Sequence, residues 1–231
     1  MRLLLIRHGQ TPSNVIGALD TGRPGPGLTG LGHAQAAAIP AVLHGERIDA
    51  IYASPLVRTQ LTATPLAADR GLEIQVVEGL EEISAGDWEM HSDREAVQGY
   101  VQTARSWLTG DLDVTIPGGE SGTEFFARYD AAVAGIAEGH RDGAAVIVSH
   151  GAAIRVWAAA RLQDIDLEDA AHWRLYNTGM CVLDGDPVTG WRLVSWHEEP
   201  LGGIDLEDPS ALDVPAEPVG EPGEPVETPA G

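Results

Sequence analysis

Short apolar runs alternate with longer amphipathic stretches along the first two hundred residues of this chain. The runs that have the length and composition of buried strands are Leu3–Ile6, Ala50–Ser54, Glu73–Val77 and Ala144–Ser149, with two further strands expected at Met180–Leu183 and Trp191–Trp196. Alternation of buried strands with helices is typical of sheets covered on both faces. The pattern therefore predicts an α/β fold, a three-layer α/β/α sandwich with a mostly parallel central sheet.

The stretches between these strands carry helix signals. We expect helices over residues 30–44, capped by Thr29 and kinked or ended early at Pro40, over residues 56–69, bent at Pro65, and over about residues 152–161. Ser121 and Glu124 have the spacing of a capping box. The apolar stripe that follows the capping box at helical spacing is Phe125, Tyr129, Val133 and Ile136.

The composition changes at Gly202. Residues 202–231 carry eight acidic and no basic residues, and they hold six of the fifteen prolines in a repetitive EPVGEPGEPVE pattern. Such a segment buries too little apolar surface to offset the entropy of ordering it. We therefore expect one folded domain over residues 1–201 and a disordered acidic tail over residues 202–231. A partner-binding role for the tail stays open.

Charge and cysteine usage narrow the choice of partners and compartment. The net charge is −21, and all fourteen basic residues are arginine, so the surface repels nucleic acid and anionic membranes. Cys181 is the single cysteine, which excludes an internal disulfide. No apolar run is long enough for a membrane span, and the first residues do not form a signal peptide. We expect a cytoplasmic protein without nucleic-acid or membrane partners; the oligomeric state stays open.

Polar clusters follow the predicted strands. RHG comes after the first strand, SPLVR after the second and SHG after the fourth, while Glu82 lies a few residues beyond the third. Because ligands bind at the carboxyl ends of the strands in open α/β sheets, these clusters are expected to converge. They would bring together Arg7, His8, Arg58, Glu82 and His150.

These residue types fit phosphoryl transfer. Arginine forks match phosphate oxygens, and helices that begin after Gly9 and after His150 would direct N–H donors at an anion. A histidine held in one tautomer can attack phosphorus, and a nearby carboxyl group can protonate the departing oxygen. The alternative is a metal site built on the two histidines. It is disfavoured because two arginines would repel the cation and no carboxylate has co-ligand spacing.

A set of motifs then carries a family resemblance. In order along the chain they are LIRHGQTPSN, TGRPGPGLTGLGHAQA, IYASPLVRTQLTATPLA, LEEISAGDWE, PGGES, VIVSHGAAIR and YNTG. The chain thereby resembles the histidine phosphatase superfamily, in the branch with cofactor-dependent phosphoglycerate mutases and related small-molecule phosphatases. The resemblance covers nearly the whole folded part and implies a metabolite phosphatase that uses neither metal nor cofactor.

The resemblance also implies roles for individual residues. His8 is the expected nucleophile; Arg7, Arg58 and His150 are expected to bind the phosphoryl group; Glu82 is the expected proton donor; and Asn14, Gly22 and Gly151 are expected on the phosphate side. Glu82 is preferred to Glu81 because Leu80-x-Glu-x-x-x-Gly86 matches the motif spacing. His91 lies near the expected pocket.

Two departures from the family pattern concern the pocket walls. Gly25-Pro26-Gly27 replaces the usual acidic-x-Pro, so we expect a looser loop, and Met90 replaces a glycine. The stretch from Trp88 to Pro117 holds only two arginines, whereas relatives with mutase activity have a longer basic insertion there. Hydrolysis of a small phosphate monoester is therefore favoured over mutase-type transfer. A non-catalytic phosphate-binding protein ranks third, because all five core residues are present.

Overall fold

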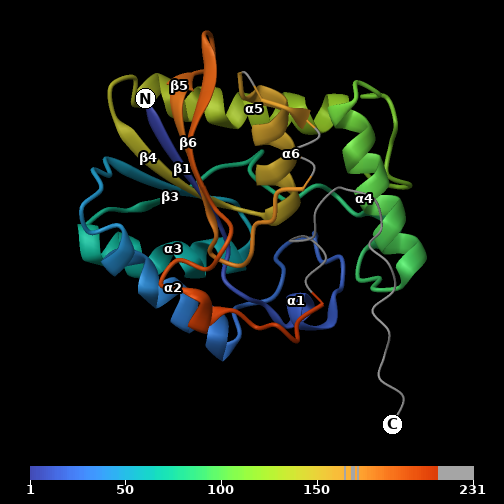
Figure 1. Ribbon diagram of the computed structural model, residues 1–231, viewed down its shortest axis with the longest axis horizontal. Coiled ribbons are helices and arrows are strands. Elements are labelled where there is room, and N and C mark those ends of the chain that lie inside the picture. The colour runs from blue at the N-terminus through green and yellow to red at the C-terminus, as the bar shows by residue number, and fades with distance from the viewer. Residues whose placement is uncertain (164, 168–169, 171, 213–231) are drawn as a thin grey trace.

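A computed structural model describes residues 1–163, 165–167, 170 and 172–212 as one sheet between layers of helices (Figure 1). The strands are β1 (Arg2–Arg7), β2 (Ala50–Ala53), β3 (Ile74–Val76), β4 (Ala144–Ser149), β5 (Met180–Asp186) and β6 (Gly190–His197). Their order is β3-β2-β4-β1-β5-β6. The first four run parallel, and β5 and β6 join as an antiparallel pair. The predicted mostly parallel sheet is confirmed.

Helices cover both faces of this sheet. They are α1 (Pro12–Ile16), α2 (Gly30–Val42), α3 (Val57–Arg70), α4 (Arg94–Leu108), α5 (Gly122–Gly139) and α6 (Gly151–Arg161), with short 3-10 turns η1 (Gly86–Trp88) and η2 (Ile204–Leu206). Helices α2 and α3 pack together on one face, and α5 and α6 lie on the other (Figure 1). Helix α4 lies against α6, farther from the sheet. This arrangement is the expected three-layer sandwich.

Strand β1 shows why the sheet is buried on both faces. Leu3 and Leu5 belong to the hydrophobic cluster under α5 and α6, and Leu4 and Ile6 belong to the cluster under α2 and α3. All four side chains are fully buried. Because successive side chains of a strand point to opposite faces, a continuous apolar run is what a central strand requires. Each burial stabilises the fold by about 1.5–3 kcal/mol.

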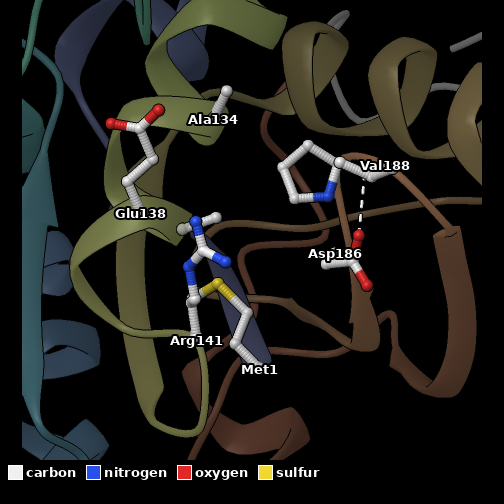
Figure 2. A pocket seen from close by; sticks show the side chains of 8 residues that line it. Met1, Ala134, Glu138, Arg141, Asp186 and Val188 are labelled. Carbon is white, nitrogen blue, oxygen red and sulfur yellow. Dashed lines mark hydrogen bonds between the residues drawn. The ribbon is translucent and has the colours of Figure 1, made fainter.

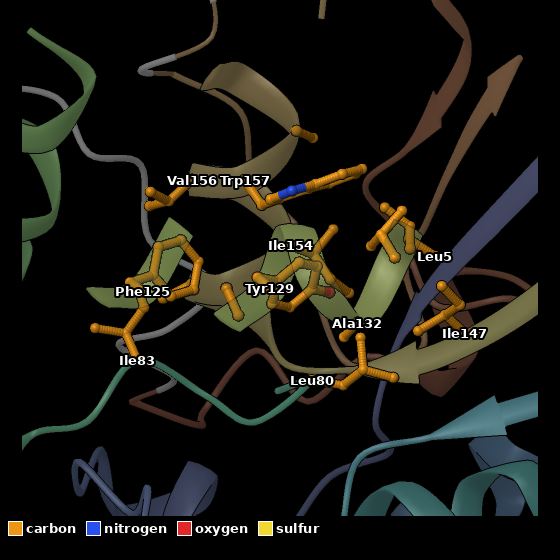
Figure 3. Packing of buried hydrophobic residues seen from close by; sticks show 14 of the residues in the cluster. Leu5, Leu80, Ile83, Phe125, Tyr129, Ala132, Ile147, Ile154, Val156 and Trp157 are labelled. Atoms are coloured by element: carbon orange, nitrogen blue, oxygen red, sulfur yellow. The ribbon is translucent and has the colours of Figure 1, made fainter. Parts of the chain in front are cut away.

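The larger cluster is built around aromatic side chains of α5 and α6 (Figure 3). Tyr129 stacks near Trp157 with ring centroids 5.4 Å apart, and Phe125 lies 5.7 Å from Tyr129. Leu80 and Ile83, which flank Glu82, pack into the same cluster and are fully buried. The core therefore anchors the loop that carries the predicted proton donor.

Both Pro40 and Pro65 lie inside helices, as the sequence predicted. Helix α2 ends at Val42, shortly after Pro40 and before the predicted end at residue 44. The kink at Pro40 and the bend at Pro65 stay predictions. Helix α4 was not predicted from the sequence, although Asp93 caps it. Its buried residues, spaced like a helical stripe, are Ala96, Tyr100, Ala104 and Trp107.

The expected disorder from Gly202 is wrong for residues 202–212. Gln10 Nε2 donates to Asp208 Oδ2 at 3.0 Å, and Gln35 Nε2 donates to the Leu206 carbonyl at 2.8 Å. The Leu212 amide donates to the Val15 carbonyl at 3.3 Å. These partners belong to distant parts of the chain, which composition alone does not show. Residues 213–231 lie outside the described part, so their disorder stays a prediction.

No helix among the described residues is long and apolar enough to cross a membrane.

Candidate active site

The parallel pairing of β1 with β4 places the two motif histidines side by side. Arg7 and Ser149 are register partners, so the next residues, His8 and His150, leave the sheet at the same edge. Their ring centroids are 5.3 Å apart, with an interplanar angle of 62°. The convergence expected from strand ends is therefore present in the structure.

The His8 imidazole is held in one tautomer. Nδ1 lies 2.8 Å from the Gly9 carbonyl oxygen, which only accepts, so Nδ1 carries the proton and Nε2 keeps its lone pair. Burial first, then the charges of Arg58 and Arg7, lower the pKa of His8 well below its ordinary value of 6.5. A neutral imidazole with a free Nε2 lone pair is a nucleophile.

His150 presents a donor instead. Its Nε2 lies 2.8 Å from Ser54 Oγ, which itself accepts from the Leu56 amide at 3.3 Å. The serine hydroxyl can donate to Nε2, and in that arrangement the imidazole proton lies on Nδ1. That Nδ1 is buried and has no hydrogen-bond partner among the described residues. Burial, followed by Arg58, lowers the pKa of His150 well below 6.5, so the ring is a neutral N–H donor for an anion.

Two buried guanidinium groups complete the basic side of the site. Arg7 Nη1 donates to the Leu175 carbonyl at 2.8 Å, and Arg58 Nη2 donates to the Asp20 carbonyl at 2.9 Å. Arg58 Nη1 is buried without a hydrogen bond in the described residues and lies 3.7 Å from Asp20 Oδ1. A buried donor without a partner is costly unless a ligand satisfies it, so this atom fits a phosphate oxygen.

Gly25 allows the approach of the loop to Arg58. Its φ is +69°, and a Cβ atom there would lie 2.5 Å from Arg58 Nη1. The Gly25-Pro26-Gly27 replacement therefore makes room for the guanidinium group, a packing role that the expectation of a looser loop missed.

Glu82 binds the N-terminus of α6. Its Oε1 accepts from the Ala153 amide at 2.7 Å and from the Ile83 amide at 2.9 Å, and Oε2 accepts from the Ala152 amide at 3.2 Å. The expectation that this helix directs its N–H donors at a substrate anion is thus corrected. The positive end of the helix is occupied by the protein's own carboxylate.

Arg128 positions the Glu82 loop and was missed by sequence reasoning. Its guanidinium donates at 2.9 Å to the Glu81 and Glu82 carbonyls, and it pairs with the Glu120 carboxylate at 2.6 Å. No motif or spacing marks Arg128, because its partners come from two other segments. The Glu81 carboxylate turns toward Arg23, with which it forms an ion pair. This supports the choice of Glu82 over its neighbour.

The remaining predicted phosphate-side residues differ in placement. Asn14 lines the cavity, and its Oδ1 accepts from the Thr11 amide at 2.9 Å. The Gly22 amide already donates to Glu89 Oε1 at 2.9 Å, so the structure does not support a phosphate contact by Gly22. Gly151 is buried at the start of α6 and does not line the cavity.

His8, Arg58, Glu82 and Tyr100 border a nearly closed cavity of about 10 Å³. Tyr100 reaches it from α4, and its hydroxyl donates to the Ile83 carbonyl at 3.0 Å. Burial, then the Glu82 charge, raises the pKa of Tyr100, which keeps the phenol protonated. His91 does not line this cavity; its Nδ1 lies 3.0 Å from Asp93 Oδ2.

A larger cavity of about 430 Å³ lies at the other end of β1, beside Met1 (Figure 2). Glu138, Arg141 and Asp186 line it, but none of its eight described lining residues is histidine, cysteine or serine. It therefore lacks the nucleophile that the smaller cavity holds. Among the described residues, no cluster of three or more histidine, cysteine or acidic side chains could hold a metal ion; independence from metals stays a prediction.

Comparison with known proteins agrees with this geometry. The family model described as the histidine phosphatase superfamily (branch 1) matches residues 3–199. The adenosylcobalamin/alpha-ribazole phosphatase of Escherichia coli K12 is 34% identical over 176 residues, covering 76% of this chain and 85% of that protein. The PE-PGRS family protein PE_PGRS11 of Mycobacterium tuberculosis is 36% identical over 226 residues, 90% of this chain, which spans only 38% of its length.

The fold of this chain is also similar to that of solved phosphatase structures. A mycobacterial glucosyl-3-phosphoglycerate phosphatase superposes with a TM-score of 0.71 and 30% sequence identity, covering 86% of this chain and 99% of that one.

Proposed function

This chain belongs to the histidine phosphatase superfamily, and we propose that this phosphoric monoester hydrolase acts on a small phosphorylated metabolite through a phosphohistidine intermediate. The observation that carries the proposal is the single tautomer of His8. The Gly9 carbonyl holds the proton on Nδ1, so the Nε2 lone pair is available beside Arg58 and His150. Relatives named as phosphatases support hydrolysis as the outcome.

In the first half-reaction, Nε2 of His8 attacks phosphorus while the bond from phosphorus to the alcohol oxygen breaks. The electron pair goes to that oxygen, which takes a proton from the carboxyl group of Glu82. Arg7, Arg58 and His150 Nδ1–H stabilise the charge on the three other oxygens. The alcohol leaves, and phosphate stays on His8.

In the second half-reaction, water attacks the phosphorus of phosphohistidine. The Glu82 carboxylate takes one proton of the water, the P–N bond breaks, and its electron pair returns to Nε2. The Glu82 carboxylate that takes this proton accepts hydrogen bonds from the amides of Ala152 and Ala153. Inorganic phosphate is released, and His8 and Glu82 return to their starting states.

The absence of a basic insertion favours hydrolysis over mutase-type transfer. A mutase holds an anionic phosphoglycerate in two orientations, and the α4 region here offers Arg94 and Arg105, both exposed. We therefore propose water as the acceptor. The cytoplasm is proposed as the compartment, since the one cysteine, Cys181, is buried and free.

Rapid-quench labelling tests this function. Mixing the enzyme with ³²P-labelled substrate and quenching in base should trap an acid-labile, base-stable label on His8, located by peptide mapping. His8→Ala should lose the label and at least about a thousandfold in turnover. Turnover by His8→Ala within tenfold of the wild type would contradict the nucleophile assignment. Exchange of 2- and 3-phosphoglycerate exceeding phosphate release would identify a mutase instead.

Removal of metal ions with a chelator tests whether turnover is independent of metals. Arg7 and Arg58 supply the positive charge that a metal supplies in other phosphatases, and His150 adds a neutral N–H donor. Turnover should therefore persist after dialysis against EDTA, and loss of activity that a divalent cation restores would contradict this part of the proposal.

A further inference from the structure

The cavity lining is partly exposed at two neighbouring residues. Of its eleven described lining residues, nine are buried, and Asp20 and Thr21 are half-buried. This partly exposed side, called the mouth, is the side on which the alcohol part of a substrate bound at His8 and Arg58 can extend toward solvent.

Asp20 is held in a fixed position at this mouth. Ser13 Oγ donates to Asp20 Oδ2 at 2.5 Å, and Arg58 Nη1 lies 3.7 Å from Oδ1. The Asp20 side chain is 11% exposed. The Asp20 carboxylate would have to break its hydrogen bond with Ser13 to turn away from an arriving group.

The charges around the mouth are unbalanced. Among the eleven described lining residues, Arg58 is the only guanidinium or ammonium group, and its role is to bind the phosphoryl group. Thr11, Thr21 and Tyr100 add only neutral hydroxyl groups. The described cavity lining therefore offers the Asp20 carboxylate and hydroxyl groups to the alcohol part, and no arginine besides Arg58.

We propose that Asp20 selects the leaving group, favouring alcohols that carry hydroxyl or ammonium donors and rejecting alcohols that carry a carboxylate near the phosphate. Donors on the alcohol can bond the Asp20 oxygens, whereas a second carboxylate meets like charge with no cation to offset it. The inference rests on the proposed function and narrows the substrates of the same site.

A matched pair of substrates tests this selection. Glycerol 3-phosphate and 3-phosphoglycerate share a carbon skeleton and differ in a terminal hydroxymethyl or carboxylate group. The wild type should show a kcat/KM for glycerol 3-phosphate about tenfold to a hundredfold above that for 3-phosphoglycerate, the size of a close like-charge repulsion. Asp20→Asn should narrow the ratio at least about tenfold, mainly by lowering KM for 3-phosphoglycerate.

Two further variants make the result specific. Asp93→Asn removes the same charge from a 59% exposed residue outside the cavity lining, and asparagine caps α4 as well as aspartate does, so the ratio should stay at its wild-type value. Ser13→Ala removes the donor that fixes Asp20 and should narrow the ratio partly. It gives a second measurement if Asp20→Asn fails to fold, as judged by thermal melting.

The opposing outcomes are distinct. Equal losses on both substrates in Asp20→Asn would mean that Asp20 only positions Arg58, and a wild-type preference for 3-phosphoglycerate would overturn the proposal outright. Hydrolysis of p-nitrophenyl phosphate, which carries no carboxylate, reports separately on the catalytic function. If the wild type fails with that substrate as well, the proposed function has failed rather than the selection.

Discussion

His8 and Glu82 show how single residues obtain their chemistry from backbone contacts. The Gly9 carbonyl fixes the His8 tautomer, and the first amides of α6 hold the Glu82 carboxylate. Arg58 keeps one buried donor without a hydrogen bond in the described residues. Each group is thus oriented before a substrate arrives, which is what electrostatic catalysis requires.

Glu82→Gln should separate substrates by leaving group. An alkoxide needs a proton in the transition state and a nitrophenolate hardly does, so hydrolysis of an alkyl phosphate should fall roughly a hundredfold to ten-thousandfold. Phosphorylation of His8 by p-nitrophenyl phosphate should be largely spared, and a nitrophenol burst should appear because the base for water is missing. Stopped-flow kinetics measures both.

Glu81→Gln is the control for that experiment, because the Glu81 carboxylate pairs with Arg23 instead of meeting the α6 amides. It should retain alkyl phosphatase activity. Equal losses on both substrate types in Glu82→Gln, without a burst, would show that Glu82 only positions the phosphate.

The buried histidines should make stability pH-dependent. Folding lowers the pKa of His8 and His150 well below 6.5, so below pH 6.5 the unfolded chain binds more protons than the folded protein. Their contribution is fully present above pH 6.5 and is lost as the pH falls, by up to about 1.4 kcal/mol per pH unit for each histidine. Urea unfolding between pH 7 and 5 measures this slope. His150→Gln should flatten it, and parallel curves would contradict the assignment.

At the scale of elements, the site depends on how loops meet at one sheet edge. The Leu19 amide donates to the His91 carbonyl at 2.8 Å, and the Met90 amide donates to the Leu19 carbonyl at 2.8 Å. These bonds join the loop after α1, in which Leu19 lines the cavity, to the segment before α4. Met90 makes the bond from a left-handed conformation, with φ of 63° and a side chain that is 54% exposed.

Met90→Gly should therefore stabilise the protein. A residue with a Cβ atom is strained at positive φ, and the exposed Met90 side chain contributes little burial, so the free energy of unfolding should rise by about 1 kcal/mol. For a chain of this size that corresponds to about 2–4 °C in Tm. Met90→Ala removes the same side chain without relieving the strain and should not raise Tm. Equal shifts in both variants would assign the effect to the side chain.

At the scale of the whole molecule, the order of the strands brings distant segments of the chain to one edge of the sheet. The last described segment, residues 202–212, contacts the regions of α1 and α2. Residues 202–212 bond to Gln10 and Val15, which are close in sequence to His8 and Asn14, and to Gln35 on α2. The segment thereby contacts the loop after β1 and holds it by hydrogen bonds. These contacts distinguish residues 202–212 from the more proline-rich residues that follow in the sequence.

Two truncations should behave differently. Ending the chain after Leu212 removes only residues 213–231, which have no apolar pattern, and should leave Tm and turnover unchanged. Ending it after Leu201 removes the bonds to Gln10, Gln35 and Val15 as well, and Tm should fall by several degrees, at about 2–4 °C per kcal/mol. Differential scanning calorimetry with a turnover assay measures both. An unchanged Tm in the shorter chain would show that the segment contributes no stability.

The sequence by itself predicted the six strands, four of the helices and the candidate catalytic residues. Leu3–Ile6 and Ala144–Ser149 are apolar runs that only a doubly covered sheet can bury, and RHG and SHG follow directly. Local patterns suffice there, because hydrophobic periodicity and strand ends are local properties. Helix α4 has such a local pattern too, with Asp93 as its cap and buried residues at helical spacing.

Only the tertiary structure decided what each polar group contacts. Arg128 bonds to the Glu82 loop, Glu89 takes the Gly22 amide, and α6 directs its amides at Glu82 instead of at a substrate. The contacts of residues 202–212 with Gln10, Gln35 and Val15 are likewise decided by the tertiary structure. Each of these contacts joins segments that are far apart in the chain. Their geometry follows from the packing of the whole fold, so no local pattern of residues encodes it.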